Sequence, residues 1–393
     1  MPGVEGFIYP NEIELQWSVL IVLYPFITGL VAGAFILASL ERVFNVAAVR
    51  PTYRLALLTA LAFLLVAPLP LQMHLGHPER SYEMYITPHL DSAMAMFGFV
   101  YLWYLMGVLL LEIWLDYRKD LVETWRSSTG LKRLFYGALT LWSDDVSPQA
   151  LRIDDRIARI VTIVGIPSAF LLHGYVGFIF GSVKANPWWS TPLMPVVFIF
   201  SAMVSGIAAV MLIYMLLCRL RRVPIDMLCL DTIAKYLFFA FVIDFSLETL
   251  DLTHRIYEAG EAFGALDFMV KTRLFVSHIV VQILFGTLLP ILMLAVTQVV
   301  RLGEKTRRWM YGTAGALTLV GIFAMRWNVV IGGQLFSKSL LGYTTYKMEF
   351  ATREGLLPAI AIMVLPFIIL AVLLRLLPPW GKAGQMADPK VGA

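Results

Sequence analysis

The chain has 393 residues, of which 59% are hydrophobic and 15% are charged, and its formal net charge is +4. Soluble domains carry about 25% charged residues, so this composition, with a mean hydropathy of +0.76, indicates an integral membrane protein. The small net charge and the lack of a basic cluster interleaved with aromatic residues argue against nucleic acid as a partner. The chain has only two cysteines, Cys218 and Cys229. Because an iron–sulfur cluster needs four thiolates, we expect none in this chain.

Nine stretches are long and apolar enough to cross a bilayer, and membrane backbone must form helices to satisfy its own hydrogen bonds. The predicted spans are residues 18–40, 55–73, 92–111, 160–183, 188–218, 236–252, 274–300, 309–335 and 355–374. The connections after odd-numbered spans, with the C-terminal tail, contain 22 Lys and Arg residues, whereas the N-terminus and the other connections contain 8. Positive loops face the cytoplasm. We therefore expect one polytopic all-α membrane domain over residues 1–393, with the N-terminus outside and the C-terminus inside.

The longest predicted inner connection covers residues 112–159 and contains LKRLFYGALTLW at residues 131–142. This segment mixes basic and bulky apolar residues. Such a pattern is typical of a helix that lies flat on the membrane surface, and a plain linker helix is the alternative.

Three carboxylates fall in the predicted sixth span, in the stretch FVIDFSLETLDL. Asp244, Glu248 and Asp251 are separated by four and then three residues, so a helix presents them on one face. A carboxylate at the centre of a membrane helix costs about 2.5–3.5 kcal/mol on insertion scales and usually serves a pathway or a site. The stripe indicates proton-coupled chemistry inside the membrane.

The other polar residues of the spans lie toward the predicted outer side. His173, His278 and Arg326 fall in the outer halves of the fourth, seventh and eighth spans. The remaining histidines lie in outer loops or at outer helix ends: His74, His77, His89 and His254. The chemistry is therefore expected near the outer face.

Structural interpretations compete with this functional one. Asp251 is close to a helix end, where water can solvate it, and Glu248 can serve only as a partner of Arg326. We expect Arg326 to pair with a carboxylate, because a buried unpaired guanidinium is costly. His173 on an apolar helix can be a hydrogen-bonded packing residue. Asp244 is the deepest carboxylate and the hardest to explain structurally.

Three classes of function fit histidine, carboxylate and arginine in a water-poor cavity. In a quinone site, a histidine or tyrosine hydrogen-bonds one carbonyl and a carboxylate takes a proton. A proton-coupled secondary transporter also places charges inside the membrane, although alternating access needs a route from both sides. A haem b anchor needs facing histidines, and only His173 and His278 lie within spans.

Several longer motifs resemble the NrfD/PsrC family of polysulfide-reductase-type membrane subunits. These are HLGHPERSYEMYITPHLDSAMAMFGF (74–99), HGYVGFIFGSVKANPWWSTPLMPVVFIFSAMVSGIA (173–208) and RWNVVIGGQ (326–334). The chain length and the stretch FSKSLLGYTTYKMEFATREGLLP are similar to the longer DsrP/HybB-like branch, and DsrP-type subunits are the most similar.

The resemblance implies two four-helix bundles plus an extra helix in a bacterial or archaeal cytoplasmic membrane. It also implies a quinone or menaquinone substrate, no haem or iron–sulfur cluster in this chain, and a role in sulfur-compound metabolism. A ferredoxin-like iron–sulfur subunit would dock outside, on residues 74–91, 184–187 and 253–273, with a multihaem cytochrome c as a possible further partner. Short family members use a histidine in the first helix, where this chain has Tyr24. The longer branch implies His173 and Asp244 as quinone contacts.

The working hypothesis is a quinone-interacting subunit that acts only within a redox complex. His173 hydrogen-bonds a quinone oxygen and Asp244 transfers the proton. Glu248 and Asp251 form an outward proton exit, and Arg326 keeps these carboxylates ionised. Tyr24, Gln16 and His77 are weaker candidates for the mouth of the pocket, and no metal site is expected.

Overall fold

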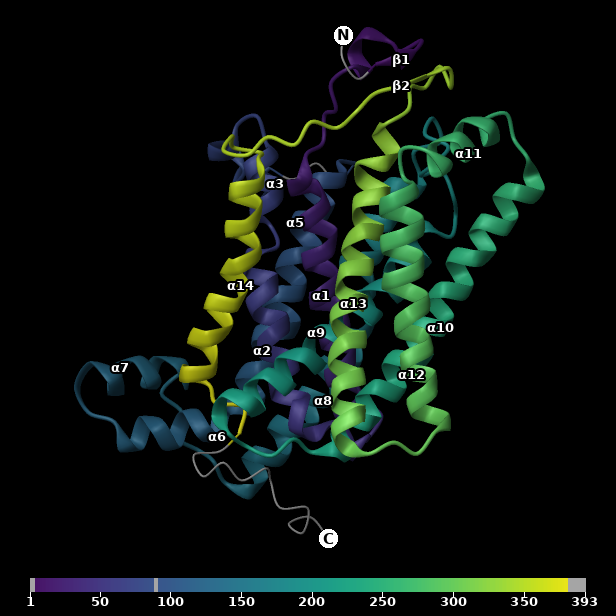
Figure 1. Cartoon of the computed structure of the whole chain (residues 1–393). Helices are drawn as coiled ribbons and strands as arrows, with labels where there is room; N and C mark the ends of the chain where they lie inside the picture. Colours follow the sequence, from purple (N-terminus) through teal and green to yellow (C-terminus); the bar gives the residue numbers. More distant parts are fainter. Residues whose placement is uncertain (1–3, 88–90, 381–393) are drawn as a thin grey trace.

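Long apolar helices dominate the structure, a computed structural model that describes residues 4–87 and 91–380 (Figure 1). His89, in one of the predicted outer loops, lies outside the described residues, as does the stretch from 381 to 393.

The first half of the chain contains the elements from β1 to α8. After β1 (Glu5–Gly6) and the short 3-10 helix η1 (Pro10–Glu12), the elements are α1 (Val19–Arg42), η2 (Ala47–Val49), α2 (Arg50–Val66), α3 (Leu69–His74), η3 (Pro78–Arg80), α4 (Glu83–Ile86), α5 (Ala93–Leu102), the π-helical η4 (Trp103–Leu110), α6 (Leu111–Ser127), α7 (Gly130–Leu139) and α8 (Pro148–Gly181).

The second half supplies another set of long helices. It contains α9 (Met194–Arg221), α10 (Met227–Glu258), α11 (Phe263–Lys271), the π-helical η5 (Phe275–Leu288), α12 (Leu289–Val299), α13 (Glu304–Val330), η6 (Gly332–Gln334), β2 (Gly342–Tyr343) and α14 (Leu356–Leu376).

Eight helical segments in the described part are long and apolar enough to cross a membrane, and each corresponds to a predicted span. They confirm an all-α membrane fold. The remaining predicted span, 236–252, lies inside α10, which has 32 residues and is therefore about 48 Å long. The length of α10 is therefore sufficient to cross a membrane. Its charged residues, Lys235 as well as the acidic ones, are what separate it from the other eight helical segments in composition.

The helices associate as two groups that meet along α1 and α9. The first group contains α1, α2, η4 with α6, and α8, and the second contains α9, α10, η5 with α12, and α13. The last helix, α14, packs on α2 and α1. This arrangement agrees with two four-helix bundles plus one extra helix.

Close backbone approaches between glycines set how these helices cross. A Cβ atom built on Gly206 of α9 would lie 2.4 Å from the Cα of Gly33 in α1. A Cβ atom on Gly286 of η5 would lie 2.2 Å from the Cα of Gly321 in α13. Small residues allow membrane helices to pack at this distance. These four helices carry several of the polar residues described below, among them Thr28, Ser201, Gln282 and Arg326.

The two ends of the bundle differ. At one end, here called the β1–β2 end, β1 and β2 pair in antiparallel register, with Glu5 opposite Tyr343, near α3 and α11 (Figure 1). At the other end, called the α7 end, α7 projects sideways from the bundle (Figure 1). Helix α7 covers most of the predicted surface segment at 131–142, and its position on the membrane surface remains a prediction.

Candidate functional site

Arg326 of α13 lies at the contact between the two helix groups and is fully buried. Its Nη2 donates to Ser201 Oγ at 2.6 Å and lies 3.1 Å from His173 Nε2. The guanidinium also lies over the ring of Phe198, 4.0 Å from its centroid, which is a cation–π geometry. We call Thr28, His173, Phe198, Ser201 and Arg326 the buried arginine cluster.

The hydrogen bonds of this cluster define the protonation state of His173. Nδ1 lies 3.1 Å from Thr28 Oγ1, and this hydroxyl donates to the carbonyl of Tyr24 at 3.0 Å. The hydroxyl therefore accepts from Nδ1–H, and Nε2 accepts from Arg326, because a guanidinium can only donate. His173 is then a neutral imidazole with both ring nitrogens in use.

The expected ion pair of Arg326 is not present. Within residues 4–87 and 91–380, no carboxylate oxygen lies within 4.0 Å of its guanidinium. Asp244 and Glu248 are nevertheless the charged groups that act electrostatically on it over a longer distance. Neutral partners replace the predicted carboxylate. Ser201 comes from α9, which packs directly against α13, and His173 reaches the guanidinium from α8.

Asp244 lies one helical turn from Glu248 on α10 and is only 2% exposed. Its Oδ1 is buried without a hydrogen-bond partner among the described residues. Glu248 and Arg326 are the charged groups that act on it. A buried polar atom left unpaired costs about 1–3 kcal/mol and is uncommon. Asp244 is therefore a candidate for proton exchange rather than a structural group.

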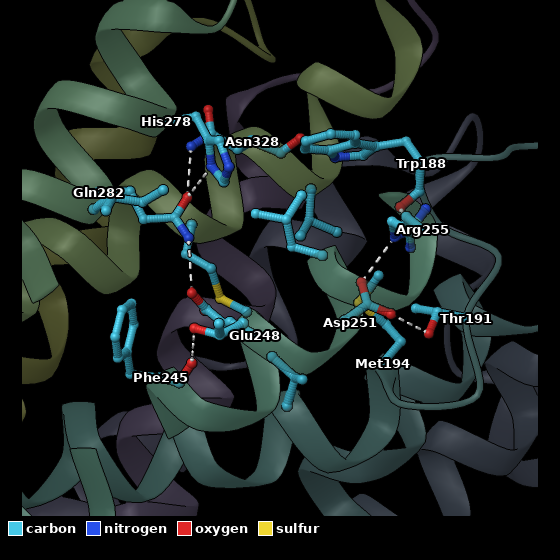
Figure 2. Close-up of a pocket in the computed structure, with 16 residues that line it drawn as sticks. Trp188, Thr191, Met194, Phe245, Glu248, Asp251, Arg255, His278, Gln282 and Asn328 are labelled. Carbon is cyan, nitrogen blue, oxygen red and sulfur yellow. Dashed lines mark hydrogen bonds and ion pairs between the residues drawn. The ribbon is translucent and has the colours of Figure 1, made fainter. Parts of the chain in front are cut away.

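A cavity of about 330 Å³ lies inside the second helix group (Figure 2). Its lining includes the last part of α10 and the first part of η5, which lie toward the β1–β2 end (Figure 1). We call this cavity the bundle pocket. Figure 2 shows polar side chains on two sides of it, with apolar side chains between them. Its lining residues are Trp188, Thr191, Met194, Val197, Phe245, Glu248, Thr249, Asp251, Leu252, Arg255, His278, Gln282, Ile283, Met325, Asn328 and Val329.

Four side chains form a continuous hydrogen-bonded chain along one side of the bundle pocket (Figure 2). Gln282 Oε1 accepts from Asn328 Nδ2 at 2.8 Å and lies 2.9 Å from His278 Nδ1. Gln282 Nε2 donates to Glu248 Oε2 at 3.4 Å. Because an amide oxygen only accepts, Nδ1 of His278 carries its proton, and Nε2 of the neutral ring keeps the lone pair.

Helix geometry and neighbouring side chains hold this hydrogen-bonded chain in position. His278 and Gln282 are four residues apart on η5, and π-helical turns such as these frequently occur at functional sites. Ser277 Oγ donates to Asn328 Oδ1 at 2.7 Å, which holds the amide of α13 toward η5. Trp188 Nε1 donates to the Asn328 carbonyl at 2.9 Å, and its ring meets His278 edge-on.

Asp251 lies on the other side of the bundle pocket and is ion-paired. Its Oδ2 accepts from Arg255 Nε at 2.8 Å, and its Oδ1 accepts from Thr191 Oγ1 at 2.5 Å. Arg255 also donates to the carbonyls of Pro187 and Trp188. Asp251 therefore anchors the connection between α8 and α9.

The structure separates the predicted site residues. Glu248 and Asp251 line the bundle pocket, whereas His173, Asp244 and Arg326 lie outside its lining. Tyr24 is buried in α1 with its ring edge-on to Phe97, and its hydroxyl has no hydrogen-bond partner among the described residues.

The two remaining candidates lie elsewhere at the β1–β2 end. Gln16 lines a separate polar cavity of about 640 Å³, together with Tyr346 and Arg353. His77 is exposed and lies 3.0 Å from Glu79 through Nδ1. Neither belongs to the lining of the bundle pocket.

Sequence reasoning did not assign Gln282, Asn328, Trp188 and Arg255 to the site. Trp188 lies within the motif at 173–208 and Asn328 lies within RWNVVIGGQ, so a signal was present for them. Gln282 and Arg255 have no local signal, because a single polar residue in or beside an apolar helix does not reveal which helix it faces.

The site does not supply a pair of available histidines for a haem. Both nitrogens of His173 are hydrogen-bonded within the protein, so binding to iron would break one of these bonds, whereas His278 keeps a lone pair at Nε2. In the part of the chain that the structure describes, no group of three or more His, Cys, Asp or Glu side chains is placed to hold a metal ion.

The fold and this site define a multi-pass helical membrane protein with polar groups and a ligand-sized cavity inside its second helix group. The pattern of the polysulphide reductase NrfD family matches residues 10–338. The chain therefore belongs to the NrfD family, and it is a protein of the bacterial or archaeal cytoplasmic membrane.

Two of three similar proteins are named as reductase subunits, and the third is named NrfD. A selenate reductase subunit of Mesobacillus selenatarsenatis is 28% identical over 390 residues, which cover 94% of this chain and 88% of the relative. A putative dimethyl sulfoxide reductase membrane subunit of Halobacterium salinarum is 32% identical over 61% of this chain and 52% of its own length. Protein NrfD of Escherichia coli is 28% identical over 51% of this chain and 60% of its own length.

Proposed function

We propose that this chain is the membrane subunit of a respiratory reductase complex, and that it exchanges electrons and protons with a membrane quinone in the bundle pocket. Its family and the names of its relatives support the role in a redox complex. The observation that carries the quinone assignment is a mainly apolar pocket with Glu248, His278 and Gln282 on one side. Ligand pockets combine apolar walls with a few polar groups in this way.

The polar chain of the pocket is suited to both protons of a quinol. Oxidation of one quinol breaks two O–H bonds and releases two protons and two electrons. His278 can accept one proton at Nε2, since its Nδ1–H is held by Gln282. Glu248 can accept the other proton on its carboxylate, and quinone reduction reverses both transfers. Gln282 contacts both groups and keeps them oriented.

Asp244 extends this proposal away from the pocket. It lies one turn from Glu248, and Arg326 supplies positive charge to both carboxylates. In this scheme protons pass between Glu248 and Asp244, and His173 positions Arg326 rather than contacting the quinone. Asp251 serves as the anchor of Arg255 rather than as a proton exit. We place the pocket on the periplasmic side, as the distribution of Lys and Arg predicts.

The electrons need an acceptor or donor in another subunit. We propose a ferredoxin-like iron–sulfur subunit docked at the β1–β2 end, because the bundle pocket lies toward that end, with a cytochrome c as a possible further partner. The resemblance of the sequence motifs to DsrP-type subunits supports a role in sulfur-compound metabolism. The names of the relatives support a reductase as the enzymatic partner.

The test is the turnover of a quinol analogue by the purified complex, with the dissociation constant of a quinone-site inhibitor measured in parallel. Removing a general acid or base typically costs about 10²–10⁴-fold in rate. We expect Glu248→Gln and His278→Phe each to lower turnover by about 10²-fold or more. His278→Phe should also raise the dissociation constant of the inhibitor.

The matched control for Glu248→Gln is Glu123→Gln, which removes an exposed carboxylate of α6, away from both the bundle pocket and the proposed docking end. This control should keep the turnover of the unmodified complex. Unchanged turnover and unchanged inhibitor binding in both pocket variants would refute the assignment of this pocket to quinone.

A further inference from the structure

A further recess lies at the α7 end of the second helix group, away from the bundle pocket. Its volume is about 530 Å³, and its walls come from the last turns of α9, the connection into α10 and the first turns of α13. Three arginines line it: Arg219, Arg222 and Arg308. We call this feature the arginine recess.

The two segments that frame the arginine recess are strongly basic. Residues 219–222 and 301–308 contain seven Lys and Arg residues and a single acidic residue, Glu304. Glu304 pairs with Arg308 at 3.2 Å. Across the two stretches that the structure describes, no carboxylate oxygen lies within 4.0 Å of the guanidinium of Arg219 or Arg222. Arg219 and Arg222 therefore give the recess positive charge that no carboxylate pairs with in the described part of the chain.

Apolar side chains border the same recess. Leu216 and Trp309 line it and are 54% and 66% exposed, and Leu220, one turn along α9 from Leu216, is 68% exposed. Both α9 and α13 are helices of membrane-spanning length, and the arginines lie at their ends. Tryptophan at such an end is typical of the interface between lipid headgroups and acyl chains.

We propose that the arginine recess binds the phosphate of an anionic phospholipid headgroup, with the acyl chains along Leu216 and Leu220. Guanidinium groups bind phosphate oxygens through paired hydrogen bonds. Basic pockets between membrane helices bind anionic headgroups for this reason. The inference depends neither on the quinone assignment nor on which side of the membrane this end faces.

The test is native mass spectrometry of the purified complex, titrated separately with phosphatidylglycerol, phosphatidylcholine and inorganic phosphate. The variant carries Arg219→Gln, Arg222→Gln and Arg308→Gln together. Its control carries Arg126→Gln, Lys132→Gln and Arg133→Gln, which remove the same charge from the α6–α7 region at the same end. We expect about ten-fold or greater loss of phosphatidylglycerol affinity in the first variant and no loss in the control.

The titrations with phosphatidylcholine and inorganic phosphate test whether the bound phosphate belongs to an anionic lipid. Equal affinity for phosphatidylcholine would overturn the proposal, because it would indicate an apolar contact without headgroup recognition. Displacement of phosphatidylglycerol by an equal concentration of inorganic phosphate would also overturn it and would indicate a soluble ligand. Should the triple variant fail to fold, Arg219→Gln and Arg222→Gln are tested singly. Each should lower the affinity at least about two-fold, and unchanged binding in both would refute the proposal.

Discussion

The crossing of η5 and α13 offers the sharpest test of how the bundle pocket is built. An alanine Cβ at position 286 would lie 2.2 Å from the Cα of Gly321, whereas ordinary van der Waals contact begins at about 3.4 Å. The Gly286→Ala change must therefore separate the two helices by about 1.2 Å. Asn328 Nδ2 and Gln282 Oε1, now 2.8 Å apart, would then lie about 4 Å apart, beyond hydrogen-bonding range.

This displacement should change the thermal stability of the complex and its affinity for a quinone-site inhibitor. Overpacking typically costs about 1–3 kcal/mol, so we expect a lower melting temperature of the purified complex in detergent. Loss of the bond that orients Gln282 contributes about 1 kcal/mol to ligand positioning, so quinone-site inhibitor binding should weaken about five- to ten-fold.

The matched control is Gly312→Ala on α13, where the new Cβ would meet, among the described residues, only Met215 Cε, at 3.5 Å. This variant should keep both the stability and the inhibitor affinity. Should Gly286→Ala behave like Gly312→Ala in both assays, the reasoning that links this crossing to the pocket is wrong.

Three further predictions concern the polar contacts of the site. Thr28→Val removes the partner of His173 Nδ1 and should destabilise the protein by about 1–3 kcal/mol, whereas Thr59→Val, which loses only a bond within its own helix, should cost less in the same thermal melt. Asp251→Asn should increase hydrogen exchange in residues 184–193, because Arg255 loses its ion pair; Asp267→Asn, in an exposed pair with Lys271, should leave that segment unchanged. Arg326→Lys should lower stability by about 1–3 kcal/mol, since an ammonium cannot reproduce the planar contacts to His173 and Ser201, and an equal effect of Arg301→Lys at an exposed position would contradict this.

The helices of this protein are largely predictable from its sequence. Eight of the nine predicted spans correspond to helices of suitable length and composition, because a long apolar run in a membrane has few alternatives to a helix. The helical spacing of Asp244, Glu248 and Asp251 was also correct, since all three lie on α10.

The contacts of these carboxylates were not predictable in the same way. Their spacing suggests one shared role, yet each has a different environment. Asp251 is ion-paired with Arg255, Glu248 accepts from Gln282, and Asp244 Oδ1 has no partner among the described residues. The helical pattern predicts on which face of its helix a residue lies. It does not predict which side chain of an adjacent helix contacts that residue.

The sequence by itself therefore determined the membrane class, the helices and the presence of polar groups within them, because these depend on local composition and helical period. Only the tertiary structure decided which groups meet. His173 joins Thr28 and Arg326 across 145 and 153 residues of sequence. The bundle pocket likewise takes His278 and Asn328 from two different helices. Helix rotation and crossing fix these contacts, and close approaches such as Gly33 to Gly206 and Gly286 to Gly321 depend on two helices at once.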